Sequence, residues 1–169
     1  MARFIHLTDE RLLARLEKSG IRMSYWGRDK WRCVYAVPVM PDFQVSYQWL
    51  RELKNRGIRT IGAIHFKIPD SEPVRVGHFH EDHVDMTAAQ AVKTFREHKT
   101  GLGLQVLIPR RIEAKEITRT LVPTQIVGWR YFPESHGKPP FCGCSYCQRG
   151  VIKNRKLREK YRAENPGAE

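Results

Sequence analysis

The chain has 169 residues, of which 41% are hydrophobic and 28% are charged, and this composition is ordinary for a globular protein with one main core. No apolar run approaches the roughly 18 residues that cross a bilayer, and the N-terminus lacks the apolar stretch of a secretory signal. We therefore expect a cytoplasmic protein with no membrane partner. The net charge of +12 favours nucleic acid as a partner, with a generally basic surface as the alternative.

The first half of the chain is expected to alternate strands and helices. Runs rich in β-branched and aromatic residues predict the strands. Short polar residues precede the periodic apolar segments that predict helices, and glycine follows them. The expected elements, in order, are a strand at 3–8, a helix that Thr8 caps and Gly20 ends, a strand at 31–39, a helix that Asp42 or Ser46 caps and Gly57 ends, and a strand at 59–68.

The second half of the chain is richer in strands. The sequence therefore predicts an α+β fold with a mixed or mainly antiparallel sheet and peripheral helices. We expect a main domain at 1–133 and a Cys/His-rich loop with a basic tail at 134–169. The expected elements are a strand at 73–79, a helix capped by Thr87, and strands at 104–108, 115–122 and 126–132.

Four potential zinc ligands lie close together in the pattern H-x5-C-x-C-x2-C. A structural zinc site takes four nitrogen and sulfur ligands, and nearby prolines and glycines let the chain bend around the ion. Cys33, His65 or a residue of a partner chain are alternatives for the fourth ligand. Reduced surface thiols or a disulfide are alternatives to the metal site. The predicted zinc ligands are His136, Cys142, Cys144 and Cys147.

Two clusters of basic residues are candidates for binding nucleic acid. Between positions 149 and 162 there are seven lysines and arginines and a single glutamate. Such a run can follow the phosphates of a nucleic acid, although it is also typical of a solvated helix face. The predicted contacts to nucleic acid are Arg110, Arg111, Lys153, Arg155, Lys156 and Arg158.

Residues 78–83 contain the string H-x-H-x-D-H. It resembles the signature of metallo-β-lactamase-fold hydrolases, in which two zinc ions hold a hydroxide that attacks a phosphate or an amide. A mononuclear or adventitious metal site and a polar exposed loop are the other interpretations. The ligands of this alternative, a metal-dependent hydrolase, would be His78, His80, Asp82 and His83.

Three further segments follow one another in a recognisable order. The first is His6-Leu7-Thr8, with an L-x-x-L helix and a Gly-Ile pair after it. The second is the strand Val-Tyr-Ala-Val-Pro at 34–38, and the third is Val-Leu-Ile-Pro at 106–109 with I-x-x-x-x-I after it. From residue 3 to residue 120 this order resembles the DarT group of ADP-ribosyltransferase toxins. More distantly, it resembles the RNA 2′-phosphotransferases of the same fold.

The resemblance implies an ADP-ribosyltransferase fold, NAD as the substrate, a nucleic-acid base as the acceptor and an antitoxin among the partners. In that family a histidine of the first strand holds the ribose of NAD and the neighbouring threonine helps to bind NAD. His6 and Thr8 are the corresponding residues. An aromatic residue of the second strand packs on the nicotinamide, and Tyr35 is the nearest match. The family's catalytic glutamate corresponds to Gln105.

Glutamine at position 105 changes the expected chemistry, because an amide carries no charge and takes no proton. The change implies an inactivated enzyme, a different acceptor, or a resemblance that stops short of activity, and Glu113 is a substitute carboxylate. Arg28 and Arg32 are candidates for the arginine of the NAD loop. From the residues alone, Gln105 either closes a local network or faces a site. A zinc-containing nucleic-acid-binding protein without catalysis is the non-enzymatic alternative.

Overall fold

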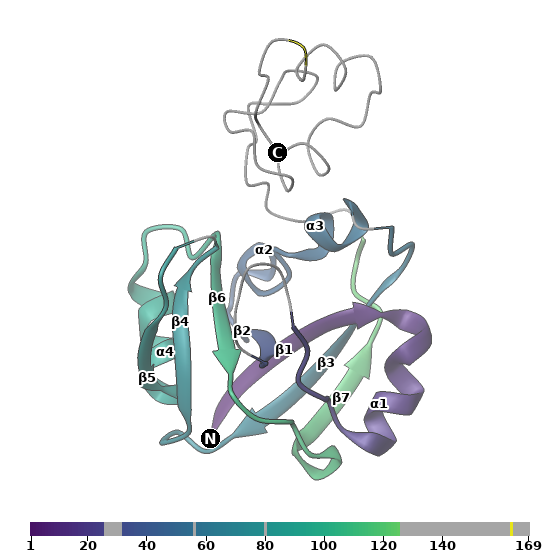
Figure 1. Ribbon diagram of the computed structural model, residues 1–169, viewed down its shortest axis with the longest axis horizontal. Helices are drawn as coiled ribbons and strands as arrows, with labels where there is room; N and C mark the ends of the chain where they lie inside the picture. Colours follow the sequence, from purple (N-terminus) through teal and green to yellow (C-terminus); the bar gives the residue numbers. More distant parts are fainter. Residues whose placement is uncertain (26–31, 56, 80, 126–162, 164–169) are drawn as a thin grey trace.

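The computed structural model describes residues 1–25, 32–55, 57–79, 81–125 and 163 (Figure 1). Within them seven strands form an antiparallel sheet in the order β5-β4-β6-β2-β1-β3-β7, which confirms the α+β class. The strands are β1 (Ala2–Asp9), β2 (Val34–Pro38), β3 (Ile61–Ile68), β4 (Pro73–His78), β5 (Val84–Thr87), β6 (Leu104–Ile108) and β7 (Ile117–Leu121).

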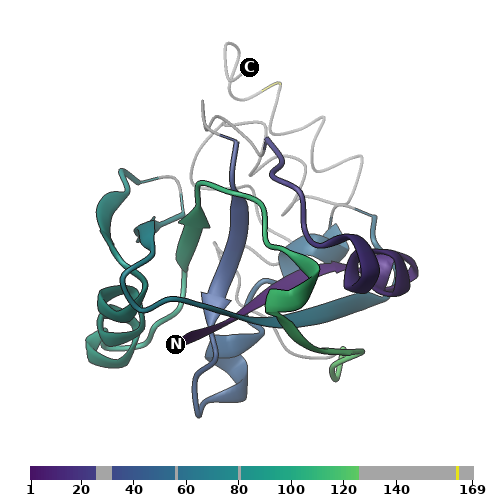
Figure 2. The same ribbon diagram turned by 90° about the horizontal axis from the view of Figure 1, so that it is seen from below.

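The helices of the described residues are few and short. None of them is long and apolar enough to span a membrane. Figures 1 and 2 place α1 and α4 at opposite ends of the sheet. The helices are α1 (Leu13–Ser19), α2 (Phe43–Ser46), α3 (Leu50–Asn55) and α4 (Ala88–Glu97), with 3-10 turns at Glu10–Leu12 and Ala114–Glu116.

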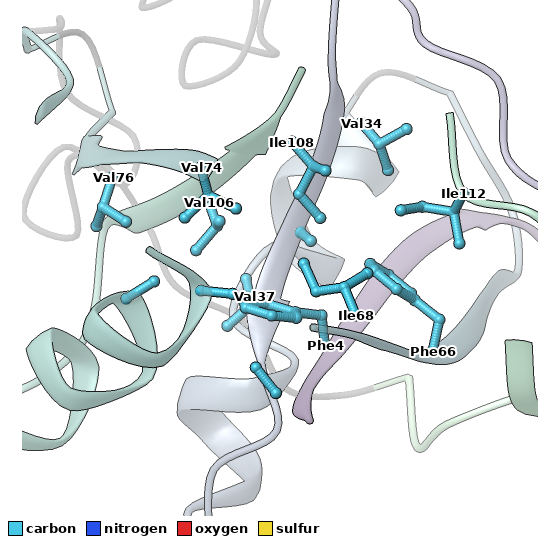
Figure 3. Close-up of a cluster of buried hydrophobic side chains, with 14 of the residues drawn as sticks. Phe4, Val34, Val37, Phe66, Ile68, Val74, Val76, Val106, Ile108 and Ile112 are labelled. Carbon is cyan, nitrogen blue, oxygen red and sulfur yellow. The ribbon is translucent and has the colours of Figure 1, made fainter. Parts of the chain in front are cut away.

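The main hydrophobic core lies on one face of the sheet (Figure 3). Successive side chains of a strand point to opposite faces, and residues paired across strands share a face. Phe4 pairs with Phe66 and Ala36 pairs with Val106, and all four are buried on the core face. The rings of Phe4 and Phe66 stack with their centroids 5.9 Å apart. The helices that cover this face contribute Leu13, Leu16, Ala88, Ala91 and Phe95.

A second, smaller hydrophobic cluster lies on the opposite face. Its strand residues alternate with those of the main core, and α2 and α3 cover them. Both faces of the central strands are therefore packed, which agrees with the burial of six of the eight residues of β3. The buried members of this cluster are Ile5, Tyr47, Leu50, Leu53, Ile61 and Ala63.

The first helical segment begins one residue later than predicted. Thr8 stays in β1, where it pairs with Gly62, so its side chain does not cap the helix. Asp9 instead caps the 3-10 turn Glu10–Leu12, where its carboxylate accepts a hydrogen bond of 3.0 Å from the backbone N–H of Arg11, and α1 follows from Leu13 with no side-chain cap. Gly20 ends α1 with φ of 77°, as predicted. The capping residue therefore depends on where the pairing of β1 with β3 ends. The residue types alone do not specify that position.

The second helix was predicted as one element, and this prediction was wrong. Asp42 caps it as expected, but the helix stops after Ser46 and resumes only at α3. The Ser46 hydroxyl is engaged with both the N–H and the C=O of Met40, at 2.9 and 3.0 Å. Tyr47 then leaves the helical conformation, with φ of −117° and ψ of 20°. The break turns the ring of Tyr47 into the smaller cluster.

The remaining strands agree with the predictions except at β5. The sequence predicted no strand between residue 79 and the helix capped by Thr87, but Val84 and the next three residues pair with β4. Thr87 ends this strand and caps α4 in a capping box with Gln90. A four-residue strand that runs directly into a helix cap leaves too short a pattern to recognise. The strand predicted at 126–132 lies outside the described residues.

Candidate functional site

His6 lies where β1 and β2 stop pairing. The ladder between these strands joins Phe4 to Pro38 and Ile5 to Val37, and it does not include the next residue. The half-buried imidazole of His6 instead reaches the Tyr35 carbonyl oxygen, with Nδ1 2.8 Å away. A carbonyl only accepts, so Nδ1 carries the proton and the lone pair is on Nε2.

The surroundings of His6 keep its ring neutral. Burial lowers the pKa of His6, and the hydrogen bond to Tyr35 opposes this effect only in part. A histidine with a pKa below its ordinary value is uncharged at pH 7. Thr8, two residues further along β1, shares the face of His6 and is also half-buried. This edge of β1 therefore offers a neutral acceptor and a hydroxyl.

Tyr35 and Gln105 lie on the same face of the sheet. The register between β2 and β6 pairs Tyr35 with Leu107, so Gln105 is two residues from the position opposite Tyr35. Such diagonal neighbours are about 7–8 Å apart, within reach of long side chains. Gln105 is only 8% exposed, although it is polar. His6, Tyr35 and Gln105 are thus on three consecutive strands, but the strand register places His6, which pairs with the core residue Ile64, on the opposite face of the sheet from Tyr35 and Gln105.

Gln105 is held by a histidine that the resemblance did not select. Its side-chain nitrogen lies 3.0 Å from Nε2 of His83, and the amide N–H donates to the imidazole lone pair. Gly77 pairs with Gln105 from the other side, on β4. A Cβ at Gly77 would lie 2.9 Å from Cγ of His83, so the glycine makes room for this ring. Gln105 therefore closes a local network at the edge of the candidate site.

The described residues of the H-x-H-x-D-H string do not converge on a point. His83 bonds Gln105, whereas Nδ1 of His78 lies 3.2 Å from the Phe79 carbonyl and 3.9 Å from the Glu81 carboxylate. Among the residues that the structure describes, no three His, Cys, Asp or Glu side chains are grouped to hold a metal. His80 lies outside the described residues. The hydrolase alternative gains no support from this part of the chain.

Two of the four arginines predicted to contact nucleic acid, Arg110 and Arg111, are engaged within the protein. Arg110 bonds two carboxylates, with Nε 2.9 Å from Glu72 and Nη2 2.7 Å from Glu116. This hydrogen bond lowers the pKa of Glu116 and holds the charge pair together. Arg111 pairs with the candidate carboxylate Glu113 at 2.9 Å, so both side chains are drawn to the loop before β7.

The other predicted site residues either make contacts elsewhere in the fold or lie outside the described residues. Arg32, one of the two candidates for the NAD-loop arginine, lies over the Tyr25 ring at 5.2 Å. Of the alternatives for the fourth zinc ligand, Cys33 is buried just before β2, and Nε2 of His65 lies 3.0 Å from the Tyr47 hydroxyl. The predicted residues outside the described part are Arg28, His136, Cys142, Cys144, Cys147, Lys153, Arg155, Lys156 and Arg158.

Comparison with protein-family models, with curated proteins and with solved structures gives no match for this chain. The function is therefore argued from the residues and their arrangement. The arrangement adds His83 to the predicted site. Its contact with Gln105 spans 22 positions in the chain, and no local sequence pattern indicates a pairing of that length.

Proposed function

We propose that this protein transfers ADP-ribose from NAD to a base of a nucleic acid, on an ADP-ribosyltransferase-like fold. One observation carries the proposal. His6, Tyr35 and Gln105 come from segments far apart in the sequence, and they lie on the consecutive strands β1, β2 and β6. The imidazole of His6 also reaches the backbone of Tyr35, although the side chains of Tyr35 and Gln105 leave the sheet on the other face.

His6 is suited to holding the ribose of NAD. Its ring is fixed by the hydrogen bond to Tyr35, and its neutral Nε2 can accept a hydrogen bond from a ribose hydroxyl. A charged imidazole would repel the positive nicotinamide ring, so the lowered pKa favours the role. Tyr35 on the neighbouring strand is the nearest aromatic match for the nicotinamide, and its ring leaves the sheet on the face that carries Gln105 rather than on that of His6.

The reaction requires a group that stabilises positive charge on the ribose and a group that takes a proton from the acceptor base, and an amide does not provide both. The bond between the nicotinamide nitrogen and ribose C1′ breaks, nicotinamide leaves with the bonding electrons, and positive charge develops on the ribose. A nitrogen of the acceptor base then bonds to C1′ and loses its proton. Gln105 can orient the ribose through its amide oxygen, but it neither offsets the charge nor takes the proton.

His83 is the group beside Gln105 that can take this proton. The Nε2 lone pair of His83 accepts the hydrogen bond from the Gln105 amide, so it can take the proton once the amide releases it. In this division of roles Gln105 positions the ribose and His83 accepts the proton from the acceptor base. The pair thereby replaces the single glutamate of the family.

The test is a transfer assay with NAD labelled in its adenylate phosphate and single-stranded DNA or RNA. We expect label to appear in the nucleic acid with the native chain and to be lost with His6→Asn. Asparagine keeps a donor for the Tyr35 carbonyl, so the fold is preserved while Nε2 is removed. Label that reaches neither nucleic acid, or that still reaches it with His6→Asn, contradicts the proposal.

A nucleic-acid-binding protein without catalysis is the second candidate, and the net charge of +12 favours it. It requires neither His6 nor NAD. In that case oligonucleotide binding is tight and steeply dependent on salt, while labelled NAD is never consumed.

A further inference from the structure

Three cationic side chains lie on one face of β1, β3 and β7. Arg3 pairs directly with Lys67, and Arg119 pairs with His65, two residues before Lys67. These pairings place Arg3, Lys67 and Arg119 on the face of the sheet that carries Ile5. Adjacent strands are about 4.8 Å apart, so the three charges span about 10 Å across the strands.

This arrangement of like charges is unfavourable for the protein alone. Two cations directly opposite each other in an antiparallel ladder repel, whereas a pair of opposite charges at such a position is stabilising. Among the described residues neither Arg3 nor Lys67 forms an ion pair. Asp70, near the end of β3, is already paired with the N-terminal amino group. The charges therefore favour an anion from outside.

An aromatic pair adjoins these cations. The Tyr47 hydroxyl bonds Nε2 of His65, and the charge of Arg119 is close enough to affect the pKa values of both rings. Phe43 packs on Tyr47 with the ring centroids 4.3 Å apart. Phe43 is 42% exposed, whereas Tyr47 is buried. The ring of Phe43 is thus exposed to solvent on one side and packs against Tyr47 on the other.

We propose that Arg3, Lys67 and Arg119 bind the phosphates of a single-stranded nucleic acid and that Phe43 stacks on one of its bases. Cations that follow a backbone beside an aromatic platform are the features by which proteins bind single strands without sequence preference. We call these four residues the basic face. Duplex nucleic acid fits less well, because its bases are already stacked.

The inference deepens the nucleic-acid part of the proposed function and does not depend on NAD. The basic face would hold the acceptor strand, while His6 and Gln105 lie on the strands that carry the candidate NAD site. Binding of a strand and binding of NAD are measured separately, so either can fail without the other.

The test is fluorescence anisotropy of a labelled oligothymidylate and a labelled oligouridylate of about a dozen nucleotides, with the full chain at several salt concentrations. The double variant Arg3→Ala/Lys67→Ala should bind about tenfold more weakly at about 50 mM salt. Its salt slope should be shallower by about 1.4, since each phosphate contact to a single strand contributes about 0.7.

The matched control removes the same charge elsewhere. Arg15 on α1 and Arg96 on α4 are exposed, and Arg15→Ala/Arg96→Ala should change affinity and slope much less. Phe43→Leu should weaken binding about tenfold without changing the slope, because it removes stacking and no charge. Equal losses in the two double variants, or no loss in either, overturn the inference. The inference is also overturned if Arg3→Ala/Lys67→Ala weakens binding to vesicles of anionic phospholipid but leaves binding to the oligonucleotides unchanged.

Discussion

Replacing Gln105 with glutamate is expected to raise the rate of ADP-ribosyl transfer about 100-fold or more. The carboxylate would offset the positive charge that develops on the ribose and could take the proton from the acceptor, which contributes about 100- to 10,000-fold in enzymes. The site tolerates the change in shape, because glutamine and glutamate are isosteric. Nε2 of His83, 3.0 Å from the Gln105 amide nitrogen, can donate a hydrogen bond to the carboxylate in its other neutral tautomer.

The assay that checks this prediction compares initial rates of label transfer from NAD at saturating nucleic acid. Gln105→Ala is the control, because it removes the amide without adding a charge, and it should transfer no faster than the native chain. A Gln105→Glu variant that folds and binds NAD but transfers no faster would show that position 105 is not at the reacting carbon.

Replacing Gly20 with alanine is expected to destabilise the fold by about 3–5 kcal/mol. Gly20 has φ of 77° and ψ of 178°, a conformation that is essentially confined to glycine. A Cβ there would overlap the carbonyl oxygen of Ile112 and lie 3.1 Å from the backbone nitrogen of Ala114. Backbone atoms cannot swing away as a side chain would. The pairing of Ile21 with Ile112 would therefore be strained as well.

Gly57 provides the matched control for this substitution. Its φ is 95°, but a Cβ would meet nothing within 4 Å. Gly57→Ala therefore carries only the backbone strain, and we expect a loss of about 1–2 kcal/mol. Thermal unfolding should show a midpoint lowered by about 10 °C in Gly20→Ala and by much less in Gly57→Ala. Equal losses would mean that the chain near Ile112 moves to accommodate the side chain.

Most of the fold could be predicted because each strand carries its own pattern. Ile61–Ile68 and Leu104–Ile108 are apolar, β-branched and bounded by breakers, so local residue types suffice to predict them. The helix break at Tyr47 could not be predicted, since it depends on the contact of Ser46 with Met40 in the preceding loop. The antiparallel order of the sheet depends on pairings between distant segments.

Part of the candidate site could likewise be predicted from the sequence, and part could not. His6 and Tyr35 were selected from short motifs, and their proximity was found only in the structure, where a side chain bonds a backbone carbonyl 29 positions away. A metal site was one interpretation of His83 because of its neighbours in sequence, but from the loop between β4 and β5 its ring reaches Gln105. The basic face could not be predicted either, because Arg3, Lys67 and Arg119 come together only through strand register.

The central claim is that β1, β2 and β6 carry an NAD site centred on His6. Calorimetric titration of NAD into the purified full chain tests it most directly, with His6→Asn beside it and His98→Ala as the control for losing an exposed imidazole. We predict a dissociation constant between about 1 µM and about 1 mM for the native chain and for His98→Ala, and no measurable binding for His6→Asn. The absence of binding heat with the native chain, or equal heat with His6→Asn, would contradict the account.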